Sequence, residues 1–188
     1  HATPLLAVGL TEEADASLAI LSDLDSALDG AVSRVLAVGD MRGLAADQVV
    51  LYGPAGGPDR IVLLGLGKAE SVDPEVIRRM AGRAVRVAEE LRLEAVAICL
   101  DGLGDVSADA AAQAAAEGAG LAAWRFTELK SDDSDEPVVN VRQIDLVGGG
   151  DNGGSAAGAM AGAAIARGAN FARTLQSRPG NVATPTHI

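Results

Sequence analysis

Residues 60–100 read "RIVLLGLGKAESVDPEVIRRMAGRAVRVAEELRLEAVAICL", and this stretch decides the predicted fold. Two short apolar runs, at 60–66 and 95–100, flank an amphipathic segment at 74–92. Continuous apolar runs of this length are typical of strands that are covered on both faces. A strand, a helix and a second strand in this order form a crossover, usually right-handed, so the two strands are expected to pair in parallel. The stretch therefore predicts an α/β domain.

The predicted helix over 74–92 carries its own start signal and one buried face. Asp73 is a candidate N-cap, and Pro74 takes the first helical position, where the missing N–H costs nothing. Apolar residues follow the spacing of a single helix face: Val76, Met80, Ala84, Val87 and Leu91.

The pattern extends outward on both sides of this unit. Apolar runs predict further strands at 5–8, 48–52 and 141–147. Ser107 is predicted to cap an alanine-rich helix over 107–124. The spaced apolar residues before Gly39 predict one or two shorter helices: Leu24, Leu28, Val32, Val35 and Leu36. Residues 1–150 are thus predicted to form an α/β domain with a mixed or mostly parallel sheet and helices on both faces.

A glycine-rich hinge, "GGGDNGG" at 148–154, separates this body from a predicted linker helix, and 151–178 are assigned to hinge and helix together. Small residues recur in the helix every four positions: Gly154, Gly158, Gly162 and Ala166. In an apolar 20-mer this stripe would suggest membrane dimerisation. Because Arg167 and Arg173 interrupt a weakly apolar segment, a helix packed closely on a neighbouring helix is favoured instead.

Composition bounds the possible functions. The chain is 48% hydrophobic but only 2% aromatic, which predicts a core of small aliphatic side chains. Its formal net charge of −11 makes nucleic acid an unlikely partner, because an acidic protein repels phosphate backbones. No run of 18 apolar residues is present, so no membrane partner is predicted. Cys99, the single cysteine, is interpreted as a buried hydrophobe, and the absence of a possible internal disulfide fits a cytoplasmic location.

Two glycine turns resemble phosphate-binding motifs without matching them. In "GLGK" at 65–68, Ala69 follows the lysine where a phosphate loop has Ser or Thr, and Glu70 stands where a dinucleotide fingerprint has glycine. "DGLGDVS" at 101–107 fails the same fingerprint at Ser107. Both are predicted to be strand-to-helix turns. Nucleotide binding remains an alternative, because α/β sheets hold ligands at the carboxyl ends of their strands.

No constellation for hydrolysis or metal binding is predicted. The two histidines, His1 and His187, sit at the chain ends, and no G-x-S-x-G motif occurs. The acidic segment at 130–137 has no ligand-spaced pattern and is interpreted as a solvated loop. No catalytic, cofactor-binding or metal-ligating residue is therefore predicted in this chain.

A row of arginines could still contact an anion or an acidic partner. Arg79, Arg83 and Arg86 lie opposite the apolar face of the helix over 74–92. The favoured interpretation is a solvated face paired with Glu75 and Glu90 at i±4 spacing.

The C-terminal stretch "ANFARTLQSRPGNVATPTHI" at 169–188 resembles the junction segment of the leucyl aminopeptidase family of metallopeptidases. The family pattern is close to Leu-x-Asn-x-Pro-Gly-Asn-x-x-Thr-Pro, leading into the first helix of a catalytic domain. The matching residues are Leu175, Pro179, Gly180, Asn181, Thr184 and Pro185, while Ser177 stands where the family usually has Asn. "DRIVLLGLGK" at 59–68 is similar to the family's strand and turn, and the order of elements also agrees.

The resemblance implies a two-domain hydrolase. Its N-terminal α/β domain resembles macro domains and helps to build a homo-hexamer. Its C-terminal domain holds two divalent metals, Mn or Zn, and removes N-terminal residues, often leucine, from peptides. The family's metal-ligand stretches, similar to "GKG…FDTGG", "DMGGA" and "NTDAEGR", do not occur in these 188 residues.

The chain is accordingly expected to be the N-terminal assembly and regulatory domain of a cytoplasmic metallo-aminopeptidase. Residues 179–188 are expected to begin the catalytic domain, with Thr184 and Pro185 announcing its first helix. The chain alone is expected to be inactive and to hold no cofactor, with the catalytic domain and sister subunits as partners. One alternative is a macro-like module that binds ADP-ribose or another nucleotide. A third is a structural interaction domain that uses the small-residue face at 154–166.

Overall fold

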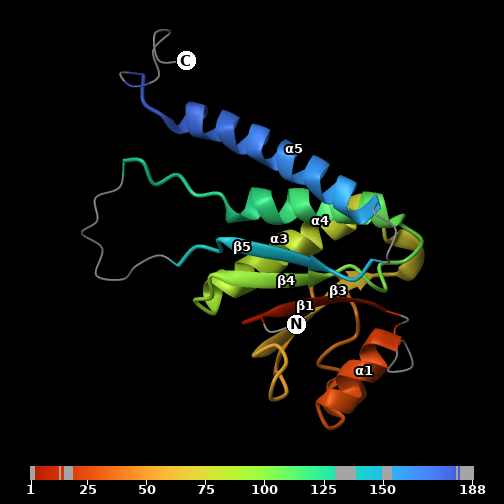
Figure 1. Ribbon diagram of the computed structural model, residues 1–188. Coiled ribbons are helices and arrows are strands. Elements are labelled where there is room, and N and C mark those ends of the chain that lie inside the picture. Colours follow the sequence, from red (N-terminus) through yellow and green to blue (C-terminus); the bar gives the residue numbers. More distant parts are fainter. Residues whose placement is uncertain are drawn as a thin grey trace.

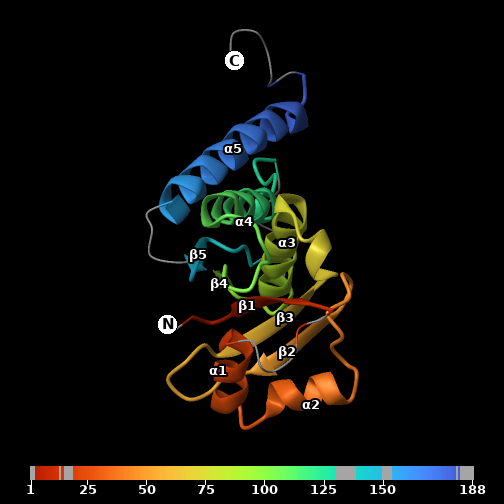
Figure 2. The ribbon, with the colours of Figure 1, turned by 90° about the vertical axis from the view of Figure 1, so that its right-hand side faces the viewer.

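The computed structural model describes residues 3–12, 14, 19–129, 139–149, 154–180 and 182. A five-stranded sheet forms the central layer, with helices α1 and α2 on one face and α3 and α4 on the other. Helix α5 lies outside α4, away from the sheet (Figure 1). Figure 2 shows the same layers of helices and sheet after a 90° turn. No helix among the described residues is long and apolar enough to cross a membrane.

The elements follow the predicted order. The strands are β1 (Leu6–Thr11), β2 (Gln48–Tyr52), β3 (Arg60–Gly67), β4 (Ala95–Cys99) and β5 (Gln143–Val147). The helices are α1 (Ala19–Ala27), α2 (Ala31–Ala37), α3 (Pro74–Glu90), α4 (Ala108–Ala123) and α5 (Gly154–Ser177), with a short 3-10 turn, η1 (Ala69–Ser71), before α3. The five predicted strands and the predicted helices are confirmed, with ends that differ by a few residues.

The strand order is β2-β3-β1-β4-β5, which corrects one inference from the sequence. β3 and β4 run parallel, as predicted from the crossover, but they do not pair with each other. β1 lies between them, with Leu6 in register with Ile61 on one side and with Ala97 on the other. β4 and β5 pair in parallel, whereas β2 pairs with β3 in the antiparallel sense. The sheet is therefore mixed and mostly parallel, as predicted.

The sheet separates two hydrophobic cores. The larger core lies between the sheet and α3 and α4, and the smaller one between the sheet and α1 and α2. Alanines dominate the α4 side of the larger core, so that helices can approach closely, as the low aromatic content predicts. The buried face of α3 is wider than the predicted stripe, because α3 contacts both the sheet and α4. Ile77, Ala81 and Val85 are fully buried there, while Val76 and Leu91 are half-buried.

Both predicted helix caps are confirmed. The Asp73 carboxylate accepts a hydrogen bond from the Val76 N–H at 2.8 Å, and Pro74 occupies the first turn of α3. The Ser107 hydroxyl oxygen accepts from the Ala110 N–H at 3.3 Å at the start of α4. Each cap accepts a hydrogen bond from an N–H that has no partner within the helix. Such a cap stabilises the folded protein by about 1 kcal/mol.

A carboxylate ties the two short helices together. Asp25 in α1 accepts hydrogen bonds from the Ser33 N–H at 2.8 Å and the Ser33 hydroxyl at 2.6 Å, in α2. These bonds lower the pKa of Asp25 below 3.8 because they favour its charged form. The stability they contribute is present above the unfolded-state pKa and is lost as pH falls through the folded-state pKa.

Ser33→Ala is expected to raise the pKa of Asp25 toward 3.8, because the hydroxyl is the largest cause of the lowering. The carboxyl carbon of Asp25 can be followed by NMR during an acid titration of the folded chain. The unaltered chain, titrated under the same conditions, is the reference. An unchanged Asp25 pKa in the variant would contradict the assignment.

Candidate functional site

The "GLGK" turn at the end of β3 is filled by the protein's own backbone. Gly67 has a φ of +85°, a left-handed conformation that favours glycine. Its N–H donates to the Gly43 carbonyl at 2.8 Å, and its carbonyl accepts from the Glu12 N–H at 2.9 Å. The Gly67 N–H, a donor that a phosphate bound at this turn would use, therefore already has a partner in the backbone. The prediction of a strand-to-helix turn is confirmed for this motif.

The ends of β4 and β5 are joined by a carboxylate. The Asp101 side chain accepts a hydrogen bond from the Gly149 N–H at 2.8 Å. A Cβ built on Gly148 would lie 2.2 Å from the other Asp101 oxygen, so the carboxylate also fills the space beside that turn. An anionic ligand at this edge would have to compete with a fixed negative charge for the same amide. This geometry disfavours a phosphate group between the two turns.

Cys99 lies beside this carboxylate and is buried, as predicted. Burial raises the pKa of the thiol, which disfavours the thiolate form that nucleophiles and metal ligands require. In the portion of the chain that the structure describes, no group of three or more His, Cys, Asp or Glu side chains could hold a metal ion. The described residues therefore do not fit the two divalent metals that the family resemblance implies. His1, His187 and the acidic segment at 130–137 lie outside the described residues.

The arginine row on α3 divides into different roles. Arg79 is exposed and pairs with Glu75 at 3.6 Å, as predicted. Arg86 pairs with Glu89 at i+3 rather than with Glu90. The prediction of a solvated residue is wrong for Arg83, which is half-buried and donates hydrogen bonds to backbone carbonyls of the loop before β2 and of β3. Sequence spacing could not reveal this contact, because the loop lies 36 or more residues away in the chain.

Helix α5 packs on α4 through the small-residue stripe, as predicted. A Cβ at Gly158 would lie 2.1 Å from the Asp109 carbonyl oxygen, and one at Gly162 would lie 2.1 Å from that of Gln113. Further along the helix, Ala166 is buried against α4. Backbone contact at this distance leaves no room for a side chain, which explains why the four-residue spacing of small residues is needed.

Polar contacts fix the C-terminal half of α5. The Trp124 indole N–H donates to the Thr174 hydroxyl at 3.2 Å, and the Arg173 guanidinium lies 5.5 Å from the indole ring centroid. Arg178 donates two hydrogen bonds to the Glu128 carboxylate, at 2.7 and 2.8 Å. This pairing lowers the pKa of Glu128 and raises the pKa of Arg178. Helix α5 is therefore held along its length by packing at one end and polar contacts at the other.

Helix α5 carries exposed apolar side chains and borders a groove that it shares with α4 and β5. Three large apolar side chains on α5 are exposed: Met160 at 74%, Ile165 at 45% and Phe171 at 64%. A groove of about 720 Å³ runs between α5, α4 and β5. Its lining includes Ile144, Leu146, Ala163 and Ala166, with Arg142 and Arg167 among its charged residues. We call this feature the α5–β5 groove.

The sequence pattern predicted a close helix contact at 154–166 but not this groove. Alternation in β5 marks Ile144 and Leu146 as one face of a strand, yet the pattern does not say that β5 is an edge strand. The groove therefore depends on the strand order, which places β5 last in the sheet.

Comparisons with known proteins agree with this architecture. The profile of the cytosol aminopeptidase family, N-terminal domain, matches residues 7–133. A probable cytosol aminopeptidase of Roseiflexus castenholzii is 34% identical over 189 residues, an alignment that covers 100% of this chain and 36% of that protein. The chain thus spans about a third of the length of the curated relatives it matches.

Solved structures of related enzymes have a similar fold over nearly the whole of this chain. A tomato leucine aminopeptidase variant superposes with a TM-score of 0.80 at 25% identity, covering 99% of this chain and 38% of that one. The bottromycin maturation enzyme BotP in complex with Mn gives 0.73 at 22% identity, covering 98% of this chain and 34% of that one. The macrodomain of Mycobacterium tuberculosis DarG gives 0.52 at 16% identity, covering 77% and 88%, and shows a likeness of fold alone. The chain therefore belongs to the cytosol aminopeptidase family, and its described fold corresponds to the family's N-terminal domain.

Proposed function

We propose that this chain is the N-terminal assembly and regulatory domain of a metal-dependent leucyl aminopeptidase, which releases N-terminal amino acids from peptides. The match of residues 7–133 to the family's N-terminal domain carries the proposal. The relatives are about three times as long as this chain, which leaves room for a separate catalytic domain. The cytosolic location proposed for the parent rests on the name that these relatives share.

The two divalent metals, Mn or Zn, are assigned to the catalytic domain rather than to this chain. A related enzyme has been solved with Mn, which supports a metal-dependent reaction. The described residues of this chain provide no carboxylate cluster that could bridge two ions. We further propose a division into an α/β domain over 1–150, a hinge and linker helix over 151–178, and the start of the catalytic domain at 179–188.

The proposed partners are the catalytic domain of the same polypeptide and the sister subunits of a hexamer. The exposed apolar side chains of α5 support a contact surface on this helix. No membrane partner is proposed, and the net charge of −11 argues against nucleic acid. The ADP-ribose alternative is not proposed, because Asp101 already accepts the Gly149 amide at the candidate phosphate position.

The proposal predicts that the 188-residue chain has no aminopeptidase activity. With Mn or Zn, the chain is expected to release no p-nitroaniline from leucine p-nitroanilide, whereas a polypeptide that also contains the catalytic domain does so. The physical reason is that the two ions which polarise the scissile carbonyl and activate water need ligands that these residues do not supply.

The control is the longer polypeptide treated with a chelator and then reloaded with Mn. Metal-dependent hydrolysis by the 188-residue chain, persisting through repeated purification, would contradict the proposal. A longer polypeptide that is folded and metal-loaded but inactive would contradict the peptidase assignment itself.

A further inference from the structure

The free edge of β5 offers unpaired backbone groups to a partner. β5 is the last strand in the sheet, so only one of its edges is paired among the described strands. The Gln143 N–H donates to the Glu94 carbonyl at 3.1 Å, and the Val147 carbonyl accepts from the Leu100 N–H at 2.8 Å. Because successive residues of a strand point their backbone groups in opposite directions, Ile144 and Leu146 present theirs to the open edge.

The side chains of the same two residues form part of the α5–β5 groove. Ile144 and Leu146 are half-buried and pack against the larger core, on the side of the sheet that α4 covers. Together with Ala163 and Ala166 of α5 they make an apolar floor. A strand added to the edge of β5 would place alternate side chains on this side of the sheet.

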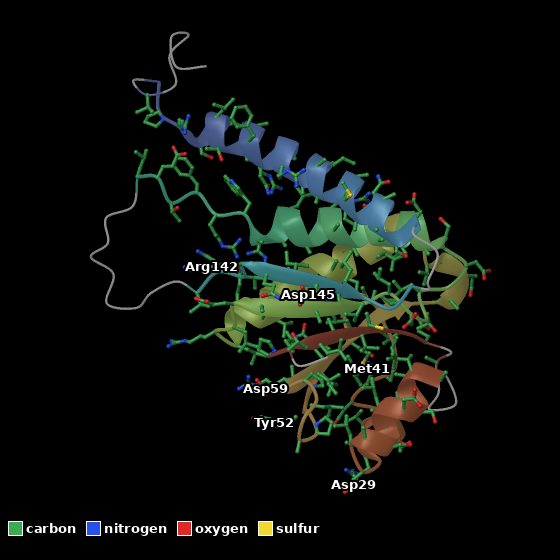
Figure 3. The ribbon with its side chains drawn as sticks, viewed as in Figure 1. Asp29, Met41, Tyr52, Asp59, Arg142 and Asp145 are labelled. Carbon is green, nitrogen blue, oxygen red and sulfur yellow. The ribbon has the colours of Figure 1, made fainter. Side chains whose placement is uncertain are left out.

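Two arginines that have no partner among the described side chains line the groove. Arg142 lies just before β5 (Figure 3), and Arg167 lies on α5; both are exposed. Neither guanidinium forms a hydrogen bond or an ion pair with any residue in the described part of the chain. The other arginines near α5 differ, because Arg173 and Arg178 are engaged by α4 and by Glu128. Two free cations beside an apolar floor are complementary to a carboxylate beside an aliphatic side chain.

We propose that the α5–β5 groove binds an extended peptide segment of a second polypeptide, in which acidic residues stand two positions before and after an aliphatic residue, so that all three side chains face the groove. The segment pairs with the free edge of β5, places an aliphatic side chain on the floor at Ile144 and Leu146, and directs carboxylates to Arg142 and Arg167. Main-chain hydrogen bonds supply affinity in this mode, and the side chains supply selectivity. The inference does not depend on the proposed peptidase parent.

A second copy of this chain fits the groove less well than an acidic peptide. In a symmetric pair each copy presents the same patch to the other, so the two arginines of one groove would approach those of the other. Like charges in such an arrangement oppose association. The groove therefore favours a partner of the opposite charge.

Fluorescence anisotropy of a labelled peptide tests the inference. The probe is a fluorescein-labelled hexapeptide of sequence Ser-Glu-Ser-Val-Ser-Glu, which places valine and both glutamates on one face, titrated with the 188-residue chain at low salt. We expect saturable binding that weakens as salt is added, because ionic attraction is screened. The double variant Arg142→Gln, Arg167→Gln is expected to raise the dissociation constant by at least about tenfold, through loss of two charge-assisted contacts.

Matched controls distinguish binding at the α5–β5 groove from non-specific attraction to the overall charge of the chain. The double variant Arg42→Gln, Arg79→Gln makes the same change of charge elsewhere and is expected to leave the dissociation constant unchanged. The hexapeptide Ser-Glu-Ser-Ser-Ser-Glu lacks only the aliphatic side chain and is expected to bind at least about tenfold more weakly. Amide hydrogen exchange locates the contact: the peptide is expected to slow exchange at Ile144 and Leu146 but not in β2, the opposite edge strand.

Several outcomes would overturn the inference. These are no anisotropy change with the unaltered chain, equal loss of binding in both double variants, or binding without protection of Ile144 and Leu146. Sedimentation of the chain without peptide tests whether a second copy of the chain occupies the groove instead. Self-association that the Arg142→Gln, Arg167→Gln variant abolishes would make a second copy the occupant and would overturn the acidic-peptide assignment.

Discussion

Gly118→Ala is expected to lower the free energy of unfolding by about 3 kcal/mol, at the upper end of the usual cost of overpacking a core. Gly118 lies where α4 crosses α3, and a Cβ there would lie 2.0 Å from the Arg78 carbonyl oxygen. The nearest atoms all belong to the backbone of Arg78, so no flexible side chain can move aside. The two helices would have to separate, and the larger core between them and the sheet would lose contacts.

Thermal unfolding followed by circular dichroism measures this effect. For a chain of this size, the expected loss corresponds to a fall in the midpoint of about 6–12 °C. Gly168→Ala on α5 is the matched control, because a Cβ there would meet nothing within 4 Å. The same substitution should then stabilise the chain by about 0.5–1 kcal/mol, since alanine forms helix more readily than glycine. A gain of stability at both positions would show that α3 and α4 are not in close contact.

Arg83→Met is expected to lower the free energy of unfolding by about 2–3 kcal/mol, because it leaves carbonyls without their charged donor. The Arg83 guanidinium donates to the carbonyl oxygens of Ala45 at 2.6 Å, Gly65 at 3.0 Å and Asp47 at 2.7 Å. The bonds fasten the loop before β2 to α3 and to β3. Burial lowers the pKa of this arginine, and the charge of Asp47 opposes that effect.

Urea unfolding of Arg83→Met measures the loss, and Arg79→Met provides the control one helical turn earlier. The Arg79 side chain is 67% exposed and forms an ion pair with Glu75, so its replacement should change stability by less than about 0.5 kcal/mol. Arg83→Lys is expected to fall between the two, because a single ammonium cannot reproduce the planar fork of a guanidinium. Equal effects at both positions would contradict the role assigned to Arg83.

The sequence predicted the elements of this fold because their signals are local. The caps at Asp73 and Ser107, the apolar runs of the five strands and the small-residue stripe of α5 each depend on neighbours within a few turns. The family resemblance also depends on local motifs of the sequence. One of them, the "GLGK" turn, lies within the residues matched by the family profile. Half of the matching residues of the C-terminal motif, Asn181, Thr184 and Pro185, lie outside the described residues.

The candidate site could be predicted only in part. The four-residue spacing of Gly158, Gly162 and Ala166 indicated a close contact, and α4 proved to be the partner. The groove beside that contact could not be foreseen, because its lining combines residues of β5 with residues of a helix whose position the sequence pattern does not predict. The role of Arg83 was also hidden, since a helical period cannot tell an arginine that faces solvent from one that faces a distant loop.

The sequence by itself thus determined which segments form strands and helices, which residues cap α3 and α4, and that both faces of the sheet are covered. Tertiary structure alone decided that β1 separates β3 from β4, that β2 runs antiparallel, and that β5 is left with an open edge. The reason is physical. Periodicity and capping are set by bonds within a few residues, whereas strand order depends on pairing between segments far apart in the chain, and the sequence pattern of a buried strand is the same beside either neighbour.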